Sequence, residues 1–139
     1  MASQLTLGII KPDAMEKRKQ GEILQRALDE GFTVVAMRQT RLTRQQAEGF
    51  YAIHRERPFF GDLCTFMTRG PVVVLALRRE DAVAHWRKVI GATNPANADE
   101  GTIRKLYGGS VTENATHGSD SEENGRLECA YFFPGHDLL

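Results

Sequence analysis

The sequence has little that would brace a fold covalently or place it in a membrane. Only two of its 139 residues are cysteines, Cys64 and Cys129, and they form no CxxC pair. Both stand in apolar segments, which predicts buried free thiols in a reducing compartment rather than a disulfide scaffold. No apolar run approaches the roughly 20 residues that span a bilayer, and the first residues do not resemble a signal peptide. We therefore expect a soluble, cytoplasmic protein with no membrane partner.

The chain also lacks a net charge. Its 18 Lys and Arg residues balance 18 Asp and Glu residues, and the pI is about 6.9. This balance argues against the broad basic surface on which non-specific nucleic-acid binding depends. A small anion held by a few well-placed cations is still compatible with the composition.

Linkers, internal repeats and low-complexity tracts are missing as well. A chain of 139 residues suits one domain, which buries roughly two thirds of the surface that its unfolded form exposes. We therefore expect residues 1–139 to form a single domain.

Short apolar runs alternate with amphipathic segments along the chain. Buried strands are predicted at 5–10, 32–42 and 72–77. Helices are predicted at 22–30, 43–54, 59–67 and 80–90. Thr43 to Gln46 matches a capping box, and Gly31 supplies a helix stop. A turn-rich segment follows at 91–97.

The order of these elements is βαββα, with room for a last strand near His117. It predicts an α/β (α+β) sandwich of ferredoxin-like βαββαβ type, in which helices cover a four-stranded antiparallel sheet. The tail is ambiguous, because Leu127, Cys129, Tyr131 and Phe133 alternate like a strand whereas residues 121–123 are typical of a helix start. Periodicity alone leaves both alternatives open.

His117 is the strongest chemical signal, because it lies among small polar residues in Asn114–Ser121 (NATHGSDS). Its unperturbed pKa, near physiological pH, leaves a large neutral fraction that can act as nucleophile, base or metal ligand. On spacing alone, a surface-loop histidine is the commoner interpretation. His54, His85 and His136 lack such a setting and are expected to be solvated.

Neither of the common glycine-rich phosphate loops, GxxxxGK[ST] or GxGxxG, occurs in the chain. Any phosphate must then be held by side chains, and arginine suits this role because its planar fork meets two phosphate oxygens at once. The candidates are Lys11, Arg87, Thr93 and Arg104. Taken singly, each is more often a solvated surface residue, so only their convergence would be informative.

Six blocks of sequence together resemble the nucleoside diphosphate kinase family. They occur in order between about residue 5 and residue 133, and the octet around His117 is highly specific. The blocks are Lys11-Pro12-Asp13, Arg57-Pro58-Phe59-Phe60, Gly70-Pro71-Val72-Val73, Gly91-Ala92-Thr93-Asn94-Pro95, Gly101-Thr102-Ile103-Arg104 and Asn114–Ser121.

The resemblance implies an enzyme in which His117 attacks the γ-phosphate of a nucleoside triphosphate and passes the phosphoryl group to a nucleoside diphosphate. One site would serve both halves of this ping-pong reaction, which is mainly positioning and charge neutralisation. Mg²⁺ would arrive bridging the nucleotide phosphates, with no metal ligand from the protein. The residues that match the family's phosphate contacts are Lys11, Arg87, Thr93 and Arg104.

Further roles follow from the same resemblance. Glu128 matches the glutamate that hydrogen-bonds the histidine's other ring nitrogen, and Ser119 matches the serine that supports it. Tyr51 matches a tyrosine whose hydroxyl lies near the histidine. The base is expected between Phe59 and Val111, and the sugar hydroxyls at Lys11 and Asn114. Stacking predicts broad base tolerance. The resemblance also implies an extra C-terminal helix carrying Glu128, and a homo-oligomer of two, four or six subunits.

Three positions depart from the family pattern. Gly125 is expected to weaken the helix that carries Glu128 by about 1 kcal/mol relative to alanine. Cys129 replaces a larger aliphatic residue, and Leu106 stands where an acidic partner for Arg104 is common. For Phe59 the alternative is core packing.

The sequence disfavours two other classes of function. A nucleotide-binding regulator without turnover is disfavoured because every matched catalytic position is intact. An RNA-binding module shares the βαββαβ architecture, but the aromatic-rich strand signature of that family is absent.

Overall fold

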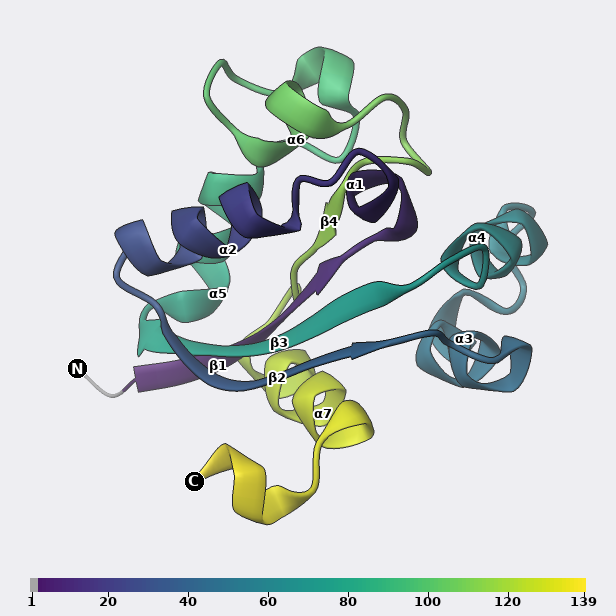
Figure 1. Ribbon diagram of the computed structural model, residues 1–139. Coiled ribbons are helices and arrows are strands. Elements are labelled where there is room, and N and C mark those ends of the chain that lie inside the picture. Colours follow the sequence, from purple (N-terminus) through teal and green to yellow (C-terminus); the bar gives the residue numbers. More distant parts are fainter. Residues whose placement is uncertain (1–2) are drawn as a thin grey trace.

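A four-stranded antiparallel sheet forms the centre of the molecule (Figure 1). The computed structural model describes residues 3–139. The strands lie in the order β2-β3-β1-β4, so that the first strand is central. Their bounds are β1 (Ser3–Ile10), β2 (Thr33–Thr40), β3 (Val72–Glu80) and β4 (Thr116–His117). The expected ferredoxin-like class is confirmed.

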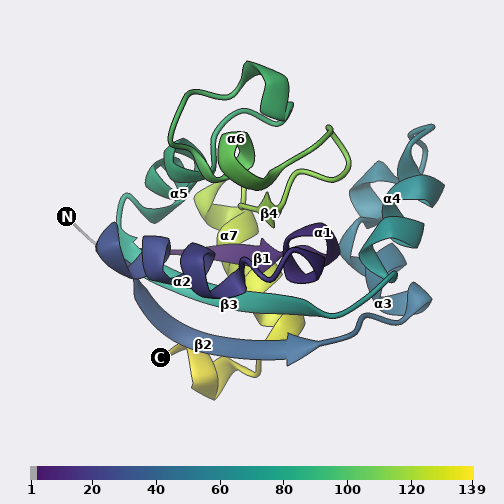
Figure 2. The same ribbon diagram turned by 45° about the horizontal axis from the view of Figure 1, so that its top comes forward.

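Helices cover both faces of this sheet (Figures 1 and 2). On one face lie α2 (Gln20–Asp29), α5 (Ala82–Ile90) and α6 (Ile103–Tyr107). The opposite face is covered by α7 (Glu122–Phe132). Three further helices follow or precede strand ends: α1 (Pro12–Glu16), α3 (Arg44–Phe50) and α4 (Phe60–Met67). Short 3₁₀ turns occupy Ala52–His54, Pro95–Asn97 and Gly135–Leu138.

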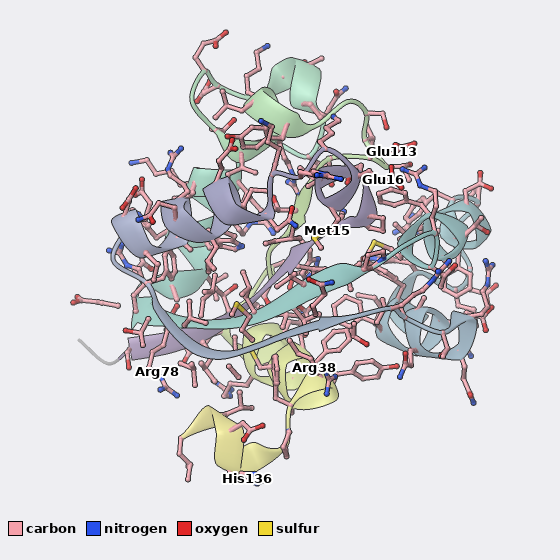
Figure 3. The ribbon with its side chains drawn as sticks, viewed as in Figure 1. Met15, Glu16, Arg38, Arg78, Glu113 and His136 are labelled. Carbon is pink, nitrogen blue, oxygen red and sulfur yellow. The ribbon has the colours of Figure 1, made fainter. Side chains whose placement is uncertain are left out.

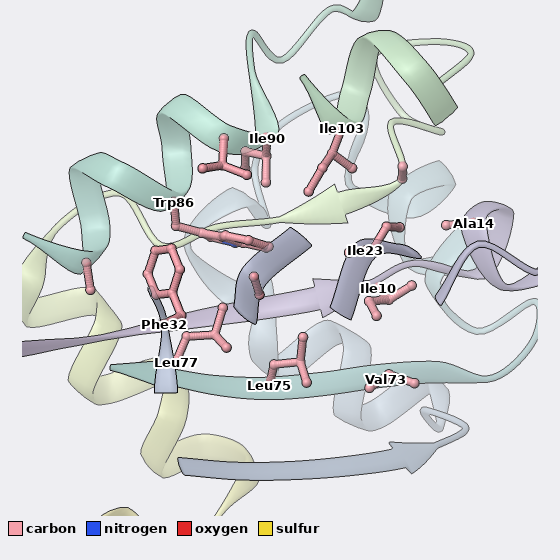
Figure 4. Close-up of a cluster of buried hydrophobic side chains, with 14 of the residues drawn as sticks. Ile10, Ala14, Ile23, Phe32, Val73, Leu75, Leu77, Trp86, Ile90 and Ile103 are labelled. Carbon is pink, nitrogen blue, oxygen red and sulfur yellow. The ribbon is translucent and has the colours of Figure 1, made fainter. Parts of the chain in front are cut away.

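Alternation along the strands divides the core into two clusters. Val73, Leu75 and Leu77 of β3 face α2 and α5, where Trp86 is fully buried (Figure 4). The edge of the Trp86 ring meets Phe32 at 5.5 Å between centroids. Such aromatic pairs add to the stabilisation that burial itself provides. This cluster fixes α5, the helix that leads into the cleft described below.

The residues between them on β3, such as Val72, Val74 and Ala76, face the other way. They pack with side chains from α3, α4 and α7, including both cysteines. Cys64 and Cys129 are buried free thiols, as the sequence predicts. Among residues 3–139, no helix is long and apolar enough to cross a membrane.

Most predicted elements are present, with two local differences in their bounds. β3 continues to Glu80 and α5 starts only at Ala82, because Asp81 adopts a left-handed backbone (φ 56°) that breaks the helix expected from residue 80. The segment 43–54 divides into α3 and a 3₁₀ turn, although its capping box is present, with the Thr43 side chain accepting from Gln46 N at 3.1 Å. The ambiguous tail is the helix α7, as the resemblance implied.

Gly125 has a packing role that the sequence did not reveal. A Cβ at this position would lie 2.2 Å from the backbone oxygen of Leu5, closer than any real contact. Glycine therefore lets α7 approach β1 closely, so its low helix propensity is offset by the contact that it permits.

Candidate active site

A cleft of about 890 Å³ opens beside the end of β1. Every predicted site residue lines it except Ser119, which is fully buried behind it. The predicted residues in its wall are Lys11, Tyr51, Phe59, Arg87, Thr93, Arg104, Val111, Asn114, His117 and Glu128. Residues separated by more than a hundred positions in sequence are thus brought to one place.

The back of the cleft is a chain of hydrogen bonds that ends on His117. The Leu7 backbone N–H donates to Ser119 Oγ at 3.0 Å, and Ser119 Oγ donates to Glu128 Oε1 at 2.7 Å. The same carboxylate oxygen lies 2.8 Å from His117 Nε2. Because a carboxylate only accepts, Nε2 carries the proton, and Nδ1 is the nitrogen left with a free lone pair.

The surroundings of His117 favour its neutral form. Burial lowers its pKa below the usual value, and the hydrogen bond and charge of Glu128 oppose this shift. The cations Lys11 and Arg104 lower it further. A neutral imidazole with a fixed tautomer is the form that acts as a nucleophile near pH 7.

The backbone before His117 is fixed by contacts that the sequence analysis missed. Ala115 has a left-handed φ of 72°, and its N–H donates to Asp13 Oδ2 at 3.0 Å. Its carbonyl accepts from Lys11 N at 2.8 Å. On the other side, Trp86 Nε1 donates to the His117 carbonyl at 3.1 Å. Asp13 and Trp86 therefore position the histidine, although neither lines the cleft.

Lys11 directly follows β1 and lines the cleft, where the negative charge of Asp13 only partly opposes the effect of burial on its pKa. Its Nζ donates to Asn114 Oδ1 at 2.8 Å. Burial, together with the nearby positive charge of Arg104, lowers the pKa of Lys11 from 10.5 to about 7. A bound anion would favour the charged form, so this lysine suits a phosphate ligand.

Arg104 is a second cation in the cleft, and it lies close enough to Arg87 for the two charges to interact. Its Nη1 and Nη2 donate to the carbonyls of Gly91 and Thr116 at 3.0 and 2.9 Å. Its Nε is buried without a hydrogen-bond partner among the described residues. Burial, and then the charge of Arg87, lower the pKa of Arg104 to about 10. Leu106, which stands where an acidic partner for Arg104 is common, is exposed. The guanidinium of Arg104 is held by backbone carbonyls rather than by a carboxylate.

Two exposed apolar side chains stand at the mouth of the cleft. Phe59 is 47% exposed and Val111 is 56% exposed, which excludes core packing as the role of Phe59. Asn114 Nδ2 donates to the carbonyls of Val111 and Thr93, both at 3.0 Å. The amide thus ties the segment containing Val111 to the turn containing Thr93.

Tyr51 lines the deeper part of the cleft. Its hydroxyl is buried and has no hydrogen-bond partner among residues 3–139. Burial, with the negative charge of Glu128, raises the pKa of this hydroxyl above its usual value. It remains protonated and is available to donate to a ligand.

The histidines expected to be solvated behave differently from one another. His136 is largely exposed, with 80% of its side chain accessible. His85 Nε2 instead lies 2.9 Å from Glu30 Oε1, and His54 lines the cleft between the rings of Tyr51 and Phe59. His54 follows Tyr51 by three residues, and this helical spacing was the available signal.

No three His, Cys, Asp or Glu side chains gather as metal ligands within the described range of 3–139. The acidic residues that line the cleft are Asp99, Asp120 and Glu128. Glu128 is already engaged by His117 and Ser119. Such a site fits a Mg²⁺ ion held mainly by substrate phosphates rather than by a protein cage.

Comparisons with known sequences and structures identify the family of the chain. The sequence profile described as "Nucleoside diphosphate kinase" matches residues 4–138. The chain belongs to the nucleoside diphosphate kinase family. Membership makes it a phosphotransferase that moves phosphate between nucleotides.

Relatives named nucleoside diphosphate kinase match over nearly their whole lengths. The one from Sorangium cellulosum is 60% identical over 99% of this chain and 96% of its own. The one from Geotalea daltonii is 55% identical over 96% of this chain and 98% of its own.

Solved nucleoside diphosphate kinase structures share the fold. The Aquifex aeolicus enzyme superposes with a TM-score of 0.96 at 42% identity, covering 99% of this chain and all of that one. A Halobacterium salinarum enzyme solved in complex with CDP has a TM-score of 0.94 at 34% identity, covering 99% of this chain and 92% of its own.

Proposed function

We propose that this kinase works by a ping-pong reaction in which His117 carries the phosphoryl group. The observation that carries the proposal is the hydrogen bond from His117 Nε2 to Glu128, which leaves Nδ1 as the free nitrogen in a cleft lined by cations. In the first half-reaction, a bond forms between Nδ1 and the γ-phosphorus while the bond from that phosphorus to the bridging oxygen breaks. The nucleoside diphosphate leaves with the electron pair, and the second half-reaction reverses these steps on another diphosphate.

The proposed roles of the other residues follow from charge. The proton on Nε2 stays in place, and Glu128 balances the positive charge that the ring gains on phosphorylation. Lys11, Arg104 and Arg87 neutralise the phosphate oxygens, with Thr93 and the Tyr51 hydroxyl as neutral donors. Ser119 holds Glu128 from behind.

Base tolerance is proposed from the shape of the cleft mouth. Phe59 and Val111 present apolar surface to the two faces of a base, which every base shares. Lys11 and Asn114 are proposed to contact the sugar hydroxyls, where the Lys11–Asn114 hydrogen bond already orients both groups.

The remaining proposals concern the setting of the enzyme. Mg²⁺ bound through the nucleotide phosphates would supply charge neutralisation that the protein's own cations do not complete. Residues 1–139 are proposed to act as one domain, assembled into a homo-oligomer. An exposed Met37 on the edge strand β2 supports assembly, and two buried free thiols support a cytoplasmic location.

The direct test is transfer of label from γ-labelled ATP onto the protein, followed by a chase with a different nucleoside diphosphate. We expect stoichiometric, acid-labile labelling that the diphosphate removes as labelled triphosphate. His117→Ala should not label. His85→Ala is the matched control, because His85 also lies 2.9 Å from a glutamate but outside the cleft.

Equal labelling of His117→Ala would overturn the proposed nucleophile. Binding of nucleotide with no phosphoenzyme would instead favour the regulator without turnover.

A further inference from the structure

An arginine outside the cleft joins three segments of the chain. Arg69 follows the C-terminal end of α4, and its guanidinium packs 5.0 Å above the Phe66 ring. Its Nε and Nη2 donate to the two carboxylate oxygens of Glu16 at 3.0 and 2.8 Å. Nη2 also donates to Glu113 Oε1 at 3.2 Å. Glu16 ends α1, and Glu113 lies in the segment between α6 and β4.

Figure 3 shows Glu16 and Glu113 close together beside α1, although they are far apart in the sequence. Both carboxylates bind the same guanidinium, and its positive charge offsets their mutual repulsion. Both carboxylates raise the pKa of Arg69, and the hydrogen bonds that Arg69 donates to Glu16 are the larger cause. The planar fork of arginine is needed, since it meets both oxygens of Glu16 and reaches Glu113 as well.

Glu113 belongs to a loop that is closed by its own hydrogen bonds. Its carbonyl accepts from Gly109 N at 2.8 Å and from Ser110 N at 3.2 Å, and its N–H donates to Ser110 Oγ at 3.0 Å. Residues 109–113 are therefore held as one turn, which includes Val111. The next residue, Asn114, is bonded to Lys11 and to the Val111 carbonyl. A side-chain contact at Glu113 thus acts on Val111 and Asn114, which line the cleft.

The same arginine is also attached to the opposite wall of the cleft. Phe59 immediately precedes α4, and Arg69 follows its other end. In Figure 2 the chain between α6 and β4 extends toward the side on which α1 and α4 lie. Through Glu113, Arg69 therefore links α4, which Phe59 immediately precedes, to the loop that carries Val111.

We propose that Arg69 is a positioning residue for the nucleotide: it holds the 109–114 loop against α1 and α4, and so sets the distance between the two apolar walls of the cleft. This rests on the proposed role of Val111 and Asn114 in nucleotide binding. Arg69 does not line the cleft and does not touch the reacting atoms. Its effect should therefore fall on substrate binding rather than on the chemical step.

The first test is steady-state kinetics of Arg69→Ala. We expect KM for the nucleoside diphosphate to rise about three- to fivefold, with kcat within twofold of the parent, since each exposed ion pair contributes little on its own. Arg126→Ala is the matched control, because Arg126 also pairs with a glutamate at 3.2 Å on the surface but contacts neither the loop nor α4. Equal KM values for the two variants would overturn the proposal.

A second variant removes the other end of the bridge. Glu113→Ala deletes the carboxylate that joins Arg69 to the loop but leaves Arg69 paired with Glu16, and it should raise KM to a similar extent. The double variant should have a KM only slightly above that of Arg69→Ala alone, because both substitutions remove the same contact between Arg69 and Glu113. Fully additive effects would contradict the bridge.

Salt gives a third readout. Added salt of roughly 0.5 M screens exposed ion pairs, so the ratio of variant to parent KM should fall toward one. A ratio that salt leaves unchanged would show that the ion pairs are not the cause.

Amide hydrogen exchange of the free protein distinguishes this proposal from the proposed function. Residues 109–114 should exchange faster in Arg69→Ala than in Arg126→Ala, whether or not the protein forms a phosphohistidine. Unchanged exchange with an intact phosphoenzyme would overturn the role of Arg69 alone. Faster exchange without any phosphoenzyme would overturn the reaction but retain the bridge.

Discussion

The two sides of the His117 ring differ in how fully their polar groups are hydrogen-bonded. Behind the ring, each polar group has a partner, from the Leu7 N–H through Ser119 and Glu128 to Nε2. In front of it, Arg104 Nε and the Tyr51 hydroxyl are buried without a hydrogen-bond partner among residues 3–139. Lys11 is buried there with a strongly lowered pKa.

This difference indicates which part of the site is complete before substrate binds. The back already fixes the tautomer and orientation of the histidine, so the nucleophile needs no rearrangement. The front leaves donors and positive charge unsatisfied, at a cost in stability that an anionic ligand would offset.

The largest effect is expected at the front, from Arg104→Ala. Removing this guanidinium takes away one preorganised phosphate donor and two contacts to backbone carbonyls. We expect kcat/KM to fall by about 10²- to 10³-fold. Steady-state assays should be paired with thermal melts to verify folding, and Arg104→Lys should recover part of the activity because it keeps the charge but not the fork. A loss below tenfold would mean that Arg104 is mainly structural.

The corresponding change at the back is Glu128→Gln. The amide keeps an oxygen that can accept from His117 Nε2 but loses the charge that balances a phosphorylated ring. We expect kcat to fall about 10- to 100-fold with little change in KM, since a hydrogen bond between charged groups is worth about 1.5–3 kcal/mol. Phosphoenzyme formation can be followed by rapid quench.

Glu123→Gln is the control for that experiment, since Glu123 is an exposed acid on the same helix. Equal losses in both variants would show that net charge, rather than the contact to His117, is responsible.

The same contrast explains which parts of the site the sequence could predict. Residues that act through their own chemistry, such as His117 and Arg104, lie within distinctive blocks, and the family resemblance that those blocks carry also implied Glu128. The structure brings all three to one cleft. Asp13 and Trp86 were missed as supports because they act on backbone groups of residues 115 and 117. Those contacts depend on strand pairing, which sequence spacing does not encode.

The C-terminal segment that forms α7 shows the same limit of prediction from sequence. Leu127 and Tyr131 suggested a strand, yet they are 61% and 45% exposed in α7. The buried residues are Gly125, Cys129 and Phe132, whose spacing of four and three is that of a helix. Glycine carries no apolar signal, so the buried face of this helix could not be identified until its approach to β1 was known.

At the back, Gly125→Ala tests whether the packing of α7, the helix that carries Glu128, depends on that close approach to β1. Alanine would gain helix propensity, but its Cβ would meet the Leu5 oxygen at 2.2 Å. We expect the free energy of unfolding to fall by about 1–3 kcal/mol, measured by urea denaturation. Gly21→Ala in α2 is the matched control, since nothing lies within 4 Å of its added Cβ, and it should be neutral or stabilising. Similar stability changes in both variants would show that the contact with the Leu5 oxygen is not the cause of the loss.

The smallest effect concerns the charge of Lys11 at the front. Its pKa of about 7 means that the free protein loses this proton as pH rises through 7, whereas an anionic nucleotide binds the protonated form. The dissociation constant of a nucleoside diphosphate should then rise by up to about tenfold per pH unit above 7, with proton uptake on binding, because the phosphate's own last ionisation near pH 6 is largely complete there. Calorimetric titrations at pH 7 and 8, in buffers of different ionisation enthalpy, measure both quantities. Lys11→Arg keeps its charge across this range, so its affinity should vary much less with pH. If the affinity of the parent protein also varies little with pH, Lys11 stays charged in the free cleft. The front of the site would then differ less from the fully hydrogen-bonded back than the burial of Lys11 implies.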